Sequence, residues 1–193
     1  PVGDLLRFCH GLPALAWAVA LVAAFEAMIL TLLPVYCLQP GFTAEIALAM
    51  VSTVVVGDAL LQLPIGALAD YLPRRTLFLS CAVLLLVSSL AIPPLMHTVL
   101  IWPIWVLFGA SAGGLFTLSL ILIGERYRDD ALVRANAHVA QLWGIGCLIG
   151  PLVAGAGSQW ISGHALPLLM AAGALGLVVL LLRQGAFGAA QPA

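Results

Sequence analysis

Lysine is absent from this sequence, and charged residues of every kind are rare. The 193 residues include seven arginines and eight acidic residues, which make up 8% of the chain and give a net charge of −1. Soluble globular domains carry about a quarter charged residues, so this composition excludes a water-soluble domain. It also excludes nucleic-acid binding, because a basic surface is needed to neutralise the phosphate backbone.

Closely spaced cysteines are absent as well. The four cysteines are Cys9, Cys37, Cys81 and Cys147, and no two of them form a CxxC pair. Metal and redox sites usually show such spacing. Cys81 and Cys147 fall within apolar segments, where cysteine behaves as a small apolar side chain. We therefore expect no disulfide, no metal site and no bound cofactor.

Long apolar runs are what the sequence has instead. Hydrophobic residues make up 63% of the chain, and the mean hydropathy is +1.16. A helix needs about 20 mainly apolar residues to cross a bilayer, which is more than the apolar region of a removable signal peptide. Continuous apolar runs such as 82–87 disfavour the alternating strands of a membrane barrel. The sequence therefore predicts an all-α integral membrane protein with six transmembrane helices, at 13–36, 45–69, 76–96, 99–124, 135–157 and 165–182.

The arginines all fall on one side of these six spans. Arg7 precedes the first span and Arg183 follows the sixth, and the others follow the second and fourth spans: Arg74, Arg75, Arg126, Arg128 and Arg134. The opposite links, 37–44, 97–98 and 158–164, contain no arginine. Because cytoplasmic loops retain positive charge, we expect both termini in the cytoplasm.

The link after the second span carries the most specific motif. Gly66 is followed four residues later by Asp70, and then by the pair Arg74 and Arg75. This spacing resembles the G-x-x-x-D-(R/K)-x-G-R-R signature of the major facilitator superfamily. The resemblance implies a membrane transporter in which this cytoplasmic gating loop acts as a latch that stabilises one access state.

The local physics of this loop agrees with such a latch. Gly66 would let helices approach closely, and Asp70 would offer a carboxylate to amides at a helix N-terminus. The arginines would anchor the cytoplasmic face. Tyr71 stands where the family has a basic residue and Pro73 where it has glycine, so we expect a weakened latch.

The fifth span adds a second resemblance to the same family. Gly146, Gly150, Pro151 and Gly155 are similar to the glycine-proline helix of facilitators. Glycines at four-residue steps would let helix backbones pack closely, and Pro151 would bend the helix. Shorter stretches resemble the C-terminal half of a bacterial subgroup: 33–36, 61–66, 124–128 and 135–137.

Facilitators consist of two six-helix halves, and each half contains two inverted three-helix repeats. The resemblance therefore implies that 13–183 is one half of the fold, with repeats at about 13–96 and 99–182. Residues 1–12 would be a cytoplasmic linker and 184–193 a flexible tail. Because the chain begins with Pro1 rather than Met, we expect the N-terminal half of the same chain to be missing. The expected location is the bacterial inner membrane.

Two acidic residues lie well inside the spans. At about 1.5 Å per residue, Glu26 and Asp58 are each about 18–20 Å from the cytoplasmic end, on adjacent helices. A charge at a helix centre costs about 2.5–3.5 kcal/mol on insertion scales, so both should face a cavity or a partner. If they face each other, they titrate as a coupled pair and are candidates for proton coupling. Gln62, one turn beyond Asp58, is a candidate for lining the same cavity or for tying two helices together.

Other interpretations stay open at this point. One of the two acids could instead bond a neighbouring helix and stay protonated. An intramembrane serine protease would need a histidine deep in the membrane beside the serine of 109–113, and the four histidines fall near span ends or in links. An inert partial chain with only a structural role is the third possibility. No motif identifies a substrate, but a cavity with few charges favours apolar or weakly polar solutes such as exported drugs.

Overall fold

The computed structural model describes residues 2–160 and 163–183, so the predicted tail 184–193 lies outside the described residues. Every regular element in this part of the chain is an α-helix. The helices are α1 (Val2–Gly11), α2 (Pro13–Thr31), α3 (Leu33–Leu38), α4 (Ala44–Tyr71), α5 (Arg74–Leu95), α6 (Ile101–Arg126), α7 (Asp129–Trp160) and α8 (Ala165–Arg183). Six of them, namely α2 and α4 to α8, are long and apolar enough to cross a membrane. The predicted fold class and number of spans are confirmed.

The largest differences from the sequence prediction concern the first span, the start of the fifth span and the linker. The first predicted span is divided at Leu32, because Pro34 lies in the first turn of a new helix, α3. Helix α7 begins at Asp129, six residues earlier than predicted, with Asp129 and Asp130 in its first turn. Carboxylates are stabilised there by the positive end of the helix dipole. The predicted linker contains helix α1, which ends at Gly11.

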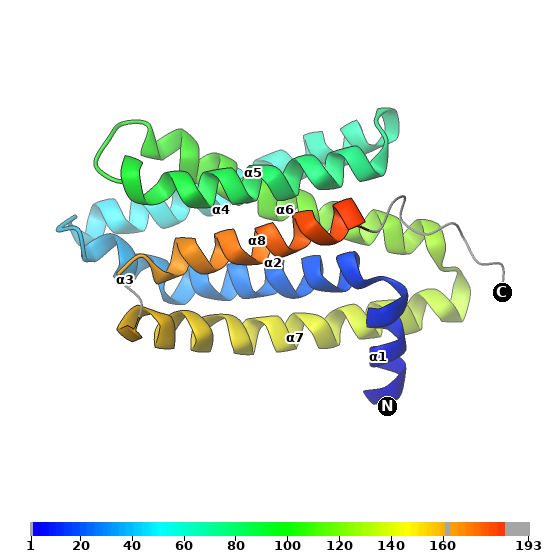
Figure 1. The fold of residues 1–193 in the computed structure, drawn as a ribbon. Coiled ribbons are helices and arrows are strands. Elements are labelled where there is room, and N and C mark those ends of the chain that lie inside the picture. The colour runs from blue at the N-terminus through cyan, green and yellow to red at the C-terminus, as the bar shows by residue number, and fades with distance from the viewer. Residues whose placement is uncertain (1, 161–162, 184–193) are drawn as a thin grey trace.

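The six long helices run side by side (Figure 1). The α4–α5 and α6–α7 links, helix α1 and the end of α8 all lie at one end of the bundle, which we call the arginine end. The α3–α4, α5–α6 and α7–α8 links lie at the other end. Successive long helices therefore run in alternating directions between the two ends of the bundle, as the arginine pattern predicts.

The packing of the six long helices has an internal symmetry. Helix α2 packs on α7 as α6 packs on α4, and α5 packs on α6 as α8 packs on α2. Helices α5 and α8 also pack on each other. Exchanging the first three long helices with the last three reproduces these pairs, which is the arrangement that two similarly folded repeats produce.

Glycines bring two of these helix pairs into backbone contact. A Cβ atom on Gly109 of α6 would overlap the backbone of Val54 on α4, and one on Gly57 would overlap the backbone of Val106. On the other side of the bundle, Gly146 of α7 lies in the same way against the Ala20 carbonyl of α2. Small residues at such crossings let membrane helices associate without a hydrophobic driving force.

Helix α1 is attached to the bundle by its own apolar cluster. Phe8 and Leu12 are buried against Leu15 of α2 and against Ala135 and Val139 of α7. This packing holds an amphipathic helix against the arginine end.

Candidate functional site

Glu26 of α2 and Asp58 of α4 line the same small cavity. The cavity has a volume of about 140 Å³, and both acidic side chains are half-buried. Its remaining walls are apolar, formed by Phe25, Ile29, Leu30, Val54 and Val55. The sequence predicts that these two acids lie at the same depth, and in the structure they line one cavity from adjacent helices.

Two contacts position the carboxyl group of Asp58. Gln62 donates a hydrogen bond from its Nε2 to Asp58 Oδ1 at 3.3 Å. Gly113 of α6 also faces this carboxyl group, so closely that a Cβ atom there would overlap Asp58 Oδ1. The position of the Asp58 carboxyl group therefore depends on Gly113 having no side chain.

Gly113 was missed as a site residue at the sequence level. From the sequence, 109–113 is a candidate serine site only, although its G-x-x-x-G spacing is typical of close helix packing. In the structure, Ser111 is buried and donates a hydrogen bond to the Phe108 carbonyl oxygen at 2.8 Å. The glycines on either side of Ser111 provide the contact with α4.

The link between α4 and α5 takes part in an ionic network at the arginine end. Arg74 donates from Nε and Nη2 to Glu125 Oε1 at 3.1 and 2.8 Å. Its Nη2 also lies 3.9 Å from Asp70 Oδ1. The network joins the end of α4, the start of α5 and the end of α6. Asp70, at the end of α4, is thus paired with Arg74 across the α4–α5 link, whereas the sequence predicted an interaction with helix N-terminal amides.

Arg75 makes a different connection. Its Nη2 donates to the Leu181 carbonyl oxygen at 3.1 Å, in the last turns of α8. A cation is favourable there because the C-terminal end of a helix carries partial negative charge. Gly66 is not a point of close approach, because a Cβ atom there would meet Thr117 Cγ2 at an ordinary 3.8 Å.

The predicted packing glycines of α7 divide into two groups. Gly146 and Gly150 lie against α2, and a Cβ atom on Gly150 would be 2.7 Å from the Ala24 Cβ. Helix α7 continues through Pro151. The prediction differs from the structure at Gly155, where a Cβ atom would meet nothing within 4 Å. Gly155 is five residues beyond Gly150, and a five-residue step rotates it about 140° away from the contact.

A bundle of six apolar helices with two carboxyl groups on one small cavity and an ionic network at one end is typical of a polytopic membrane transporter. A family model described as the Major Facilitator Superfamily matches residues 15–192. The chain therefore belongs to this superfamily, whose members transport solutes across membranes and are typically not enzymes. A comparison with curated proteins found no match.

Proposed function

We propose that this chain is part of a secondary active transporter that moves a small solute by alternating access and couples it to protons through Glu26 and Asp58. The observation that carries the proposal is the shared cavity between α2 and α4, whose other walls are apolar. Two like charges in so small a space repel each other, so the two acids gain and lose protons as a pair. Their charge state then depends on which side of the membrane the cavity faces.

The exposed faces of α4 and α7 support a second part of the proposal. Only 29% of the α4 window and 28% of the α7 window is buried, whereas the other four spans are 44–61% buried. We propose that a second six-helix half of the same chain packs on these faces. The cavity with Glu26 and Asp58 would then lie between the two halves.

Orientation follows from charge, because the arginine end would face the cytoplasm. The proposed location, the inner membrane of a bacterium, rests on the resemblance to a bacterial subgroup. The apolar walls around the two acids favour efflux of apolar or weakly polar solutes.

The test uses Glu26→Gln in the full-length transporter, reconstituted in vesicles with an imposed pH gradient. A panel of fluorescent apolar solutes, including ethidium, reports transport. We expect proton-driven movement to fall at least tenfold, because glutamine cannot release a proton, while solute exchange without a gradient persists. Glu45→Gln is the matched control, since Glu45 is exposed in the first turn of α4. Unchanged proton-driven transport in Glu26→Gln would refute the coupling role.

A further inference from the structure

A second cavity, of about 680 Å³, lies at the arginine end between α1, the end of α6 and α7. Its polar lining comes from Asp4, Arg7, Tyr127, Arg134, His138 and Gln141. The only carboxylate among these side chains is that of Asp4, which pairs with Arg7 at 3.7 Å where both side chains are well exposed to solvent. An exposed pair of this kind is weak, so a stronger anion can replace it. With Arg134 added, the lining carries a net positive charge and suits a phosphate group.

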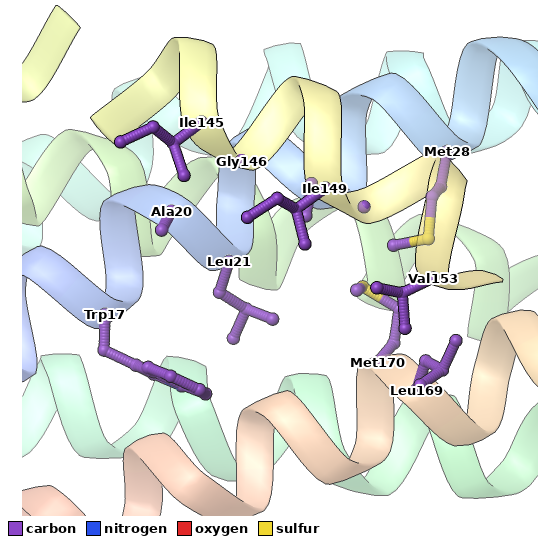
Figure 2. A pocket seen from close by; sticks show the side chains of 12 residues that line it. Trp17, Ala20, Leu21, Met28, Ile145, Gly146, Ile149, Val153, Leu169 and Met170 are labelled. Carbon is purple, nitrogen blue, oxygen red and sulfur yellow. The ribbon is translucent and has the colours of Figure 1, made fainter. Parts of the chain in front are cut away.

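An apolar groove of about 340 Å³ lies farther along α7, between α2, α7 and α8. Figure 2 shows Trp17 and Leu21 of α2, Ile145 and Ile149 of α7, and Met170 of α8 around it. Along α2 it extends from Trp17 to Met28, which at 1.5 Å per residue is about 16 Å. This length is close to half of the ~30 Å hydrocarbon core, which is the depth of one leaflet.

The polar cavity and the apolar groove follow each other along one face of α7. Arg134, His138, Gln141, Ile145 and Ile149 are separated by steps of three or four residues, so they lie on one side of the helix. Gln141 lines the cavity and Ile145, one turn later, lines the groove.

The length of α7 places the beginning of this face, at Arg134, at the membrane surface. Its candidate span, Asp129–Ser158, has 30 residues and would measure about 45 Å, which exceeds the ~30 Å hydrocarbon core. The first turns of α7, including Arg134, therefore stand at the level of the lipid headgroups. A basic pocket at this level, next to a groove one leaflet deep, matches the two ends of a lipid molecule.

We propose that this composite site binds one anionic phospholipid, with the phosphate at Arg7 and Arg134 and one acyl chain in the groove between α2, α7 and α8. The two arginines select a headgroup with net negative charge, and the groove selects a lipid over a free phosphate. The lipid would hold α1 against α7. This site is separate from the cavity of Glu26 and Asp58, so its test does not depend on transport.

Native mass spectrometry of the full chain in detergent tests the proposal with three probes. These are dioleoyl phosphatidylglycerol, dioleoyl phosphatidylcholine with the same chains, and glycerol phosphate, which has no chains. We expect at least tenfold tighter binding of phosphatidylglycerol than of phosphatidylcholine and no binding of glycerol phosphate at the same concentration. Equal binding of the two lipids would overturn the headgroup assignment, and glycerol phosphate binding as tightly as the lipid would overturn the role of the groove.

Matched variants separate the two ends of the site. Arg7→Gln with Arg134→Gln should reduce phosphatidylglycerol binding to the level of phosphatidylcholine, while Arg128→Gln, on the exposed α6–α7 link, should not. Ile149→Trp should fill the groove and lower lipid binding at least fivefold, while Leu148→Trp, which does not line it, should have no effect. All five positions have exposed side chains, so the variants keep the fold. Full lipid preference in the double arginine variant, or unchanged lipid binding in Ile149→Trp, would contradict the proposal.

Discussion

Single glycines determine how closely the helices of this bundle approach one another. At Gly146 the side of α7 has no side chain, and the Ala20 carbonyl of α2 occupies the space where a Cβ atom would be. Two residues earlier, Gly144 meets nothing within 4 Å. The same residue type therefore has a packing role at one position and none at the other.

This difference gives a stability prediction. Gly146→Leu must push α2 and α7 apart, and overpacking of this kind typically costs about 1–3 kcal/mol. Gly144→Leu places its side chain in open space and should change stability by less than about 0.5 kcal/mol. Thermal or denaturant unfolding in detergent measures both variants. Equal stability of the two proteins would show that α2 and α7 do not cross at Gly146.

Residue depth could be predicted from the sequence, but residue direction could not. Counting from the span ends placed Glu26 and Asp58 at one level, because helix rise is constant. Their rotation was not readable, since α2 and α4 are apolar on nearly every side and offer no polar face to orient them. Gly113, which faces Asp58, was missed for the same reason.

At the scale of the helix, the links at the arginine end connect elements that are distant in the sequence. Arg74 at the start of α5 bonds Glu125 at the end of α6, and Arg75 bonds the last turns of α8. Glu125 lay in a stretch that resembled the family, yet its partner could not be inferred because ion pairing across 51 residues depends on the packed fold. Helix α1 was readable in principle, because Leu5, Phe8, Cys9 and Leu12 have the spacing of an amphipathic helix.

The Arg74 pair should respond to charge exchange. Glu125→Gln removes the ion pair, and we expect a loss of about 1 kcal/mol at most in stability, because the pair is partly exposed. The exchanged protein, Arg74→Glu with Glu125→Arg, should recover most of the loss. A double-mutant cycle on unfolding free energies measures the coupling. Asp70→Asn is the comparison, since Asp70 is 3.9 Å from Arg74 and should matter less; a larger effect there would contradict the assignment of Glu125 as the main partner.

For the whole molecule, the arginine pattern gave more information than any motif. The apolar runs predicted the six spans, and the seven arginines predicted a common side for the α4–α5 and α6–α7 links, because charge is excluded from the hydrocarbon core irrespective of how the helices pack. The symmetric pairing of the first three long helices with the last three could not be derived in this way. It depends on which small residues meet between the helices. The predicted repeat boundaries stay a prediction.

Sidedness can be measured by labelling. In a protein without native cysteines, Pro73→Cys and Arg128→Cys should react with an impermeant maleimide from one side of the membrane, and Thr98→Cys from the other. All three positions are exposed in links or turns between helices. Labelling of Pro73→Cys and Arg128→Cys from opposite sides would overturn the six-span topology.

The symmetric pairing of the helices also has a consequence for biogenesis. Helices α2 and α4 emerge from the ribosome early, yet their principal partners, α7 and α6, are synthesised later. During that interval Glu26 and Asp58 have no completed bundle around them, and leaving them in lipid is unfavourable. Until α6 and α7 are synthesised, these two acids therefore need other polar partners, in the insertion machinery, in another half of the same chain or on each other.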